Sequence, residues 1–229
     1  MRLNTLNKIL SFKKENKSFV VIRDFKSNKD FFYFDNNFDK ENEFDIKFKL
    51  QCSNALKKDK SSLISYNNKE YFLYVFNSPL KLIIIGAVHI ASSLIEIAQI
   101  LDYKIILIDP RESFLNSQQF LNIETISKWP DEALKEIYID NRTAIVTLSH
   151  DPKLDEPALI EALKSKAFYI GALGSKKTHE KRVIRLLSLG LNEDDINKIN
   201  APIGLPIGSV STKEISISIL AEITQKLRA

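Results

Sequence analysis

The chain has 229 residues, of which 44% are hydrophobic and 27% are charged, a composition typical of a globular protein rather than a disordered or fibrous one. Its formal net charge is +4. No stretch approaches the roughly 18 uninterrupted apolar residues of a membrane-spanning helix, and the N-terminal segment lacks the apolar core of a signal peptide. We therefore expect a cytoplasmic protein without a membrane partner.

The positive charge is concentrated in the first third of the chain. Residues 1–80 carry a net charge of +5 and residues 81–229 a net charge of −1. The basic residues are interspersed with acidic ones and form no dense stripe of the kind that binds nucleic acid, so no nucleic-acid partner is expected. The single cysteine, Cys52, excludes an internal disulfide and a four-cysteine zinc site within the chain.

Glycine and aromatic residues divide the chain into two parts. All six glycines follow residue 85, whereas 15 of the 22 aromatic residues precede residue 81. The segment Asn77-Ser78-Pro79 is typical of a joint between domains. We predict a small α+β domain over residues 1–78 and a second domain over residues 79–229.

The first domain is predicted to combine helices with two hairpins. Apolar residues at helical spacing place one face of a short N-terminal helix on Leu3, Leu6, Ile9 and Leu10. Residues 19–25 and 31–34 form one predicted hairpin, residues 62–66 and 71–76 form another, and residues 50–56 a second helix. The many aromatic residues are expected to fill the core rather than to stack on bases.

The second domain alternates between apolar runs and helical patterns. The runs Lys81–Gly86 and Lys104–Asp109 are typical of strands buried on both faces of a parallel sheet. Further strands are predicted at 143–149 and 167–170, with helices at 89–101, 156–164 and 175–189 and after Ser211, whose spacing to Glu214 matches a capping box. This alternation predicts an α/β fold with a doubly wound parallel sheet.

Unusual residues cluster directly after the predicted strands. In doubly wound sheets, ligands bind beyond the carboxyl ends of the strands, where the strand order reverses. Residues in these positions are therefore candidate ligand contacts: Gly86, His89, Asp109, Arg111, His150, Asp151, Gly171, Gly174 and Ser175.

The first predicted strand is followed by an incomplete dinucleotide-binding motif. The segment Gly86–Ala91 occupies the place of the pattern G-x-G-x-x-G/A, but Val88 stands at the middle glycine. A branched side chain there keeps a pyrophosphate away from the backbone. Asp109 is suitably spaced to accept a hydrogen bond from a ribose hydroxyl. NAD(P) binding is thus disfavoured, although the frame is that of a nucleotide-binding fold.

A second glycine-bearing loop, Tyr169–His179, leads into another helix. Free N–H groups and the helix dipole at such a start favour an anion, and Lys176, Lys177 and Arg182 add positive charge. Together with Asp109, Arg111 and His150, this loop predicts one shared hollow for a phosphorylated heterocycle.

Other site chemistries are less well supported by the spacing. The three histidines include no close pair of the H-x-x-x-H kind expected of zinc ligands. Ser149, His150 and Asp151 are consecutive, so their side chains diverge and cannot form a catalytic triad. A nicotinamide-dependent oxidoreductase with His150 as general acid, and a silent module that bridges other proteins, remain alternatives.

Several motifs in the second domain resemble the XdhC/CoxI family of accessory proteins for molybdenum hydroxylases. They are G-A-V-H-I-A, I-D-P-R, L-S-H-D-P-K-L-D, Y-I-G-A-L-G-S-K-K-T-H-E-K-R and P-I-G-L-P-I-G, and they span about residues 80–225 in order. The resemblance implies a Rossmann-like domain that binds molybdenum cofactor (molybdopterin), protects it during sulfuration and delivers it to a xanthine dehydrogenase-type hydroxylase. It also implies a cysteine desulfurase as a second protein partner. Lys177, Thr178 and Gly204, which lie within the matching motifs, join the candidate cofactor contacts. A homodimer is left open.

The chain departs from the family pattern at two places. Val88 replaces the second glycine of the usual G-A-G-H, and the family's glycine-rich, cysteine-bearing segment would align near Glu43, where this chain has neither residue. Cys52 is expected to be a helix residue that faces the core. Either the chain handles cofactor without a cysteine contact, or it carries a different cargo.

Overall fold

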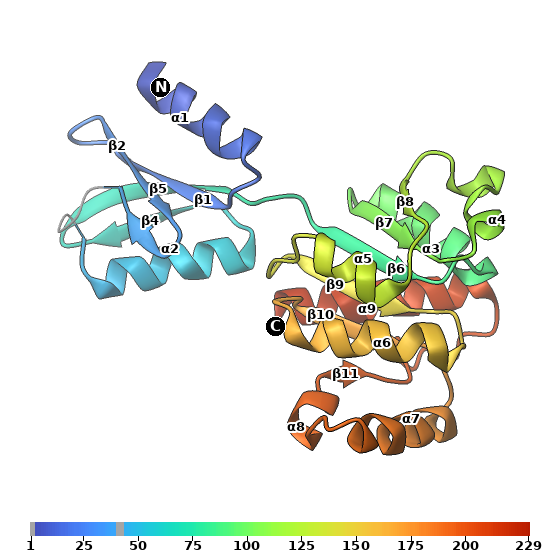
Figure 1. Ribbon diagram of the computed structural model, residues 1–229. Helices are drawn as coiled ribbons and strands as arrows, with labels where there is room; N and C mark the ends of the chain where they lie inside the picture. Colours follow the sequence, from blue (N-terminus) through green and yellow to red (C-terminus); the bar gives the residue numbers. More distant parts are fainter. Residues whose placement is uncertain (1–2, 40–43) are drawn as a thin grey trace. The chain divides into compact units, whose positions relative to one another are not determined.

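The computed structural model describes residues 3–39 and 44–229. Glu43, where the family's cysteine-bearing segment would align, lies outside the described residues. Two compact units divide the chain, one ending at Ser78 and the other beginning at Pro79 (Figure 1).

The first unit is built on an antiparallel sheet with the strand order β3-β2-β1-β5-β4. Its strands are β1 (Phe19–Asp24), β2 (Lys29–Phe34), β3 (Asn37–Phe38), β4 (Ser62–Tyr66) and β5 (Lys69–Phe76). The pairs β1–β2 and β4–β5 confirm the two predicted hairpins. In the second hairpin both turn residues, Asn67 and Asn68, have positive φ, which asparagine tolerates and which suits the twist of the flanking strands.

Helices cover both faces of this sheet. On one face, α1 (Leu3–Lys14) packs through Ile9 and Phe12 against Phe19, Val21 and Phe32. The helix is confirmed, but its predicted face is wrong, since Leu3, Leu6 and Leu10 are exposed. The Phe12 ring makes edge contacts with the rings of Phe19 and Phe32. These aromatic contacts determine which face of α1 packs on the sheet.

On the other face, α2 (Ile46–Lys58) begins four residues before the predicted helix. Asp45 caps it, because its carboxylate accepts from the N–H of Phe48. Cys52 is a residue of this helix and faces the core, as predicted, and burial raises the pKa of its thiol to about 12. The thiol therefore stays protonated and unreactive at neutral pH.

The second unit is built on a parallel sheet with the strand order β11-β10-β9-β6-β7-β8. Its strands are β6 (Lys81–Ile85), β7 (Lys104–Ile108), β8 (Glu124–Ile126), β9 (Thr143–Thr147), β10 (Tyr169–Ala172) and β11 (Ile199–Asn200). Each strand runs parallel to its neighbours. Counted along the chain, this is the 3-2-1-4-5-6 order of dinucleotide-binding folds, so the predicted fold class is confirmed. The order reverses between β6 and β9.

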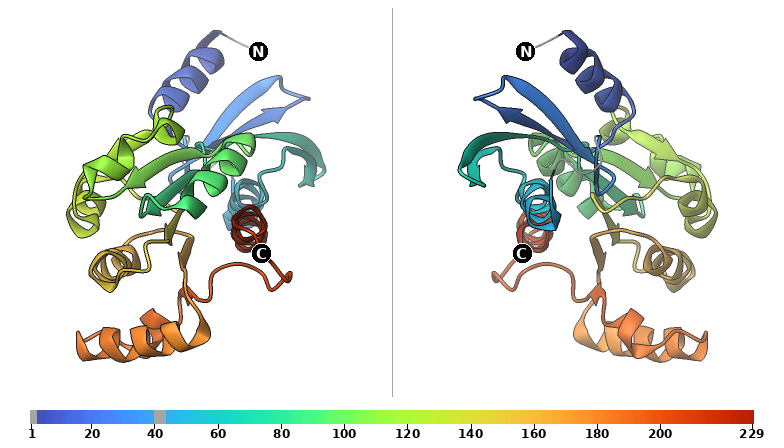
Figure 2. Two further views of the ribbon diagram at one scale, coloured as in Figure 1. Left: turned by 90° about the vertical axis from the view of Figure 1, so that its right-hand side faces the viewer. Right: turned by 90° about the vertical axis from the view of Figure 1, so that its left-hand side faces the viewer.

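Helices lie on both sides of this sheet (Figures 1 and 2). One side is covered by α3 (His89–Ile100) and α9 (Thr212–Arg228). The other is covered by α5 (Pro130–Glu136), α6 (Pro152–Lys164), α7 (Lys176–Ser188) and the short α8 (Glu193–Ile196). Two further short helices, α4 (Glu112–Leu115) and η1 (Gln118–Phe120), follow β7. The predicted capping box at Ser211 and Glu214 is confirmed.

The sequence patterns do not predict α4, η1, β8 and α5, which lie between residues 112 and 142. They also do not predict α8 and β11, which follow Gly190. The strands β8 and β11 are three and two residues long, too short to produce a readable alternation. No helix within residues 3–39 and 44–229 is long and apolar enough to span a bilayer.

The central strand β6 provides a direct test of the second core. Ile84 has no exposed surface and packs within the cluster beneath α3 and α9. We expect Ile84→Ala to lower the free energy of unfolding of this unit by about 2–5 kcal/mol, the usual cost of such a truncation, measured by urea denaturation. Ile100→Ala is the control, because Ile100 is 79% exposed; equal losses in both variants would contradict the assignment of the core.

Candidate functional site

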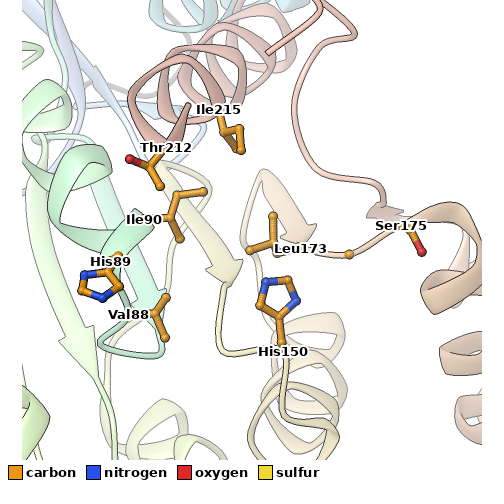
Figure 3. Close-up of a pocket in the computed structure, with 9 residues that line it drawn as sticks. Val88, His89, Ile90, His150, Leu173, Ser175, Thr212 and Ile215 are labelled. Atoms are coloured by element: carbon orange, nitrogen blue, oxygen red, sulfur yellow. The ribbon is translucent and has the colours of Figure 1, made fainter. Parts of the chain in front are cut away.

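A pocket of about 430 Å³ opens at the carboxyl ends of β6, β9 and β10. This is the edge of the sheet at which the strand order reverses, where ligands bind in doubly wound folds. Figure 3 shows Val88 and Ile90 on one side of the pocket and His150 and Leu173 on the other. Its lining residues are Val88, His89, Ile90, His150, Leu173, Gly174, Ser175, Thr212 and Ile215.

Three helices begin at this pocket. The first residues of α3 and α9 line it, and so does Ser175, the N-cap of α7. The N-terminus of a helix presents unpaired N–H groups and a partial positive charge. Together with the aliphatic side chains of Val88, Ile90, Leu173 and Ile215, these N-termini suit a ligand that combines apolar surface with an anionic group.

The two loops at the switch point touch closely. Gly86 has a φ of +102°, and a Cβ atom there would lie 2.9 Å from the Cβ of Ser149. Any larger residue would therefore push apart the loops that follow β6 and β9. Gly86 acts by permitting this contact, and it is not among the residues that line the pocket.

His150 projects from a strained position in the loop after β9. Its φ is +60°, whereas the other non-glycine residues with positive φ in the described ranges are all Asn or Asp. Such a conformation costs free energy unless the surroundings enforce it. Here Ser149 holds the turn, because its hydroxyl donates to Asp155 at 2.6 Å and accepts from the N–H of Asp151 at 3.1 Å. The backbone of this turn is thereby fixed, and the exposed imidazole of His150 lines the pocket.

A buried pair, Asp155 and Arg182, lies beneath the loops. Arg182 is among the basic residues predicted to add positive charge near the start of α7, whereas nothing in the sequence singles out Asp155. Burial raises the pKa of Asp155, although the hydrogen bond from Ser149 and the charge of Arg182 oppose this. Arg182 is 3% exposed and donates to the carbonyl of Leu173 at 2.9 Å. Its Nη2 lies 4.0 Å from the Asp155 carboxylate. The pair thus connects the loop of His150 with the loop of Gly174.

Asp109 is held at the end of β7 without any exposed surface. Its carboxylate accepts from the N–H of Ala87 at 2.8 Å and from Nε and Nη2 of Arg111 at 2.9 and 2.7 Å. Burial opposes its ionisation, but these hydrogen bonds prevail and keep the pKa of Asp109 below its usual value. Arg111 is also stacked on Phe114, with 4.1 Å between its Cζ and the ring centroid.

These contacts show which of the predicted residues line the pocket and which lie beside it. Within the described residues, the pocket lining contains His150, Gly174 and Ser175 but neither Arg111 nor Asp109. Arg111 is nevertheless close enough to the loop of His150 for the charge of Asp151, together with the hydrogen bond to Asp109, to raise the pKa of its guanidinium, so a shared anion-accepting hollow for Arg111 and His150 stays a prediction. Asp109 is not free to meet a ribose, because Arg111 and Ala87 occupy both of its oxygens.

Of the remaining candidates, His89, Ser175 and Lys177 lie at or near the pocket. Asp151, Gly171 and Gly204 instead stabilise the local structure. His89 lines the pocket with its ring on the outer side (Figure 3), and Ser175 caps α7 by accepting from Thr178 N–H at 3.2 Å, while Lys177 is exposed nearby. Asp151 caps α6 through Lys153 N–H. Gly171 and Gly204 serve packing, since a Cβ atom would lie 2.5 Å from Ile203 and 2.4 Å from Ser218, respectively.

Metal-ligating side chains do not gather at this site. In the part of the chain that the structure describes, no three His, Cys, Asp or Glu residues are grouped so that they could hold a metal ion.

Comparison with known proteins places the second unit in a family. The model of the XdhC Rossmann domain matches residues 82–223, which include the whole pocket. The chain belongs to the XdhC family. This confirms the resemblance found in its motifs.

Two curated relatives carry informative names. A molybdenum cofactor insertion chaperone of Escherichia coli, PaoD, is 38% identical over 85 residues, which are 37% of this chain and 27% of the relative. A Bacillus subtilis protein named as a probable xanthine dehydrogenase subunit is 29% identical over 146 residues, 63% of this chain and 42% of the relative. The chain thus spans less than half the length of these curated relatives.

A solved structure shares the fold along nearly the whole chain. It is described as a xanthine dehydrogenase from Bacillus halodurans and matches with a TM-score of 0.72 and 23% identity, over 98% of this XdhC chain and 67% of its own. At this identity the match establishes the fold alone.

The clasp between Asp109 and Arg111 has a pH-dependent consequence. We expect Asp109→Asn to lower the free energy of unfolding of the second unit by about 1.5–3 kcal/mol at neutral pH, as for a lost hydrogen bond to a charged group. Because the folded pKa lies below the usual 3.8, the stabilisation is present above 3.8 and is lost as the pH falls through the folded value. Urea denaturation at several pH values measures both effects.

Asp102→Asn is the control for this prediction, because Asp102 is exposed at the end of α3. The difference in stability between the wild type and Asp109→Asn should shrink in acid, whereas Asp102→Asn should change little at any pH. A difference that stays constant below pH 3.8 would show that the carboxylate charge does not stabilise the loop.

Proposed function

We propose that this XdhC-family chain binds molybdenum cofactor as cargo at the pocket beyond β6, β9 and β10 and assists its insertion into a molybdenum hydroxylase of the xanthine dehydrogenase type. The observation that carries the proposal is the position of the pocket. It lies at the reversal of the strand order, inside the region matched by the XdhC domain. The relative named as a molybdenum cofactor insertion chaperone supports the choice of cargo.

The chemistry of the cargo fits the pocket lining. Molybdenum cofactor is a flat pterin whose dithiolene sulfurs hold the metal, so the protein need not supply a metal ligand. Aliphatic side chains such as Ile90 and Leu173 offer faces for the ring system. The imidazole of His150, which lines the pocket, would hydrogen-bond the pterin edge or the oxo groups of the metal.

The anionic tail of the cargo would lie at the start of α7. Gly174 lines the pocket together with Ser175, and it has a φ of +139°, with a Cβ position only 3.0 Å from Cγ2 of Thr178, so this tight helix start requires glycine. The guanidinium of Arg182 lies below this turn, with its Nη2 3.8 Å from where a Gly174 Cβ would be. A phosphate at this helix start would be stabilised by the dipole of α7. Lys177 and Thr178 follow on the same helix.

Two finer parts of the proposal concern partners. A cysteine desulfurase would supply sulfur to the bound cofactor while the pocket shields the metal from water, and the sulfurated cofactor would then pass to the hydroxylase. The sequence leaves a homodimer open. Co-elution of the purified chain with each partner tests these contacts.

The role of His150 can be tested without changing the backbone. His150→Asn keeps a residue that tolerates positive φ but removes the imidazole from the pocket. We expect the dissociation constant for isolated molybdenum cofactor, measured anaerobically by equilibrium dialysis, to rise about tenfold to a hundredfold. This corresponds to one lost hydrogen bond to a charged or strongly polar group.

The matched control lies at the opposite edge of the sheet. Lys166 is exposed just before β10, so Lys166→Asn should leave the affinity unchanged. If His150→Asn retained wild-type affinity, the pocket would not be the cargo site. If the wild-type chain bound no cofactor at all, the proposed function itself would fail.

A further inference from the structure

The loop that leads into α9 lies beside the pocket. Its first part is the motif P-I-G-L-P-I-G at residues 202–208, and it continues to Ser211, the N-cap of α9. Thr212 and Ile215, which follow it directly, line the pocket (Figure 3). Residues 205–211, named here the rim loop, are not among the lining residues. The rim loop is therefore next to the cargo site without being part of it.

Two side chains of the rim loop expose apolar surface. Val210 is 87% exposed and Ile207 is 55% exposed. A single exposed apolar residue is common on protein surfaces. Here, however, two of them lie within four residues of each other and directly before a helix that lines a pocket. Apolar side chains gathered at such a place are typical of a protein–protein contact.

Hydrogen bonds hold the rim loop at both of its ends. The N–H groups of Val210 and Ser211 both donate to the carboxylate of Glu214, at 2.8 and 2.7 Å. The N–H of Leu205 donates to a backbone carbonyl of α9 at 3.1 Å, and the N–H of Ile207 donates to the carbonyl of Leu205 at 2.8 Å. The exposed side chains are thus carried on a fixed backbone, which lowers the entropy lost when a partner binds them.

The charges around the rim loop indicate the chemistry of the partner. Lys213 follows the loop, Lys176 and Lys177 stand in the first turn of α7, and all three are exposed. The acidic side chains in the adjoining loops, Asp151 and Glu214, are engaged as helix caps by backbone N–H groups. A surface that presents apolar side chains among lysines is complementary to an apolar cleft edged by carboxylates.

We infer that the rim loop is a docking surface for the molybdenum hydroxylase that receives the cargo, with Val210 and Ile207 bound in an apolar cleft of that enzyme whose edge carries carboxylates. The inference rests on the proposed function, because an enzyme that takes cargo from the pocket must approach the elements that line it, α9 among them. The relative named as an insertion chaperone makes the receiving enzyme the partner of choice.

The double variant Ile207→Ser/Val210→Ser tests this inference. Both residues are exposed, so the variant should fold like the wild type. Surface plasmon resonance on an immobilised, cofactor-free hydroxylase of the xanthine dehydrogenase type should show a dissociation constant raised at least tenfold. The rate at which the cofactor-loaded chain activates that enzyme, measured below saturation, should fall by a similar factor. The affinity for isolated molybdenum cofactor, measured by equilibrium dialysis, should stay unchanged, because neither residue lines the pocket.

The matched control is Ile184→Ser/Leu189→Ser. These residues are 68% and 61% exposed and lie in the second half of α7 and at its C-cap, whereas the pocket is at the start of that helix. The control removes similar apolar surface from the same unit and should behave like the wild type. Equal losses of hydroxylase affinity in the two double variants would overturn the inference.

A charge reversal provides an independent measurement. Lys213→Glu should weaken hydroxylase binding at least threefold at low salt and less at high salt, since exposed charges are screened. Lys166→Glu, at an exposed position just before β10, is its control and should change little. Equal effects of the two reversals would contradict the proposed charge complementarity.

The remaining outcomes separate the inference from the proposed function. If the wild-type chain bound no molybdenum cofactor, the proposed function would fail. If it bound the cofactor but not the hydroxylase, or if Ile207→Ser/Val210→Ser bound the hydroxylase like the wild type, the inference alone would fail. A double variant that lost only cofactor affinity, only binding to a cysteine desulfurase, or only self-association in sedimentation velocity would also overturn the inference.

Discussion

The candidate site depends on how the loops after β6, β7 and β9 are fixed at the reversal of the strand order. Asp109, buried at the end of β7, binds the backbone of Ala87 and the side chain of Arg111. Gly86 in turn contacts Ser149 so closely that no Cβ fits between them. Because a buried carboxylate must keep its hydrogen bonds, these loops have little freedom, and the positions of Val88 and His150 follow from them.

These fixed loops also explain how the architecture of a nucleotide-binding fold can accept a different ligand. The strand order and the helix N-termini of the fold are retained, and they favour an anionic ligand at the sheet edge. What changes is the first turn, whose middle position carries Val88. The fold provides the crevice, and individual side chains decide what enters it.

Much of the fold can be predicted because its strands are unusually apolar. Ile83, Ile84 and Ile85 are all fully buried, so the run reads as a central parallel strand without further information. The orientation of α1 could not be predicted in the same way. Its leucines repeat at helical spacing, but packing of Phe12 against the aromatic rings of the sheet outweighs that pattern, and this preference arises from tertiary structure.

The candidate site could be predicted in part, because the ends of the strands could be read from the sequence. Residues that follow strand ends necessarily lie at one edge of a parallel sheet, so His150 and Gly174 could be assigned there from spacing. Spacing does not show which charges neutralise each other. Arg111 is captured by Asp109 two residues earlier, and Asp155 reaches Arg182 only through the packing of α6 and α7.

Hydrogen–deuterium exchange with and without isolated molybdenum cofactor tests the central claim, that the pocket at the switch point holds the cargo, most directly. The amides at the starts of α3, α7 and α9 should gain protection together when cofactor is added, since all three line one pocket. Protection confined to other segments, such as the sheet of the first unit, would contradict the account.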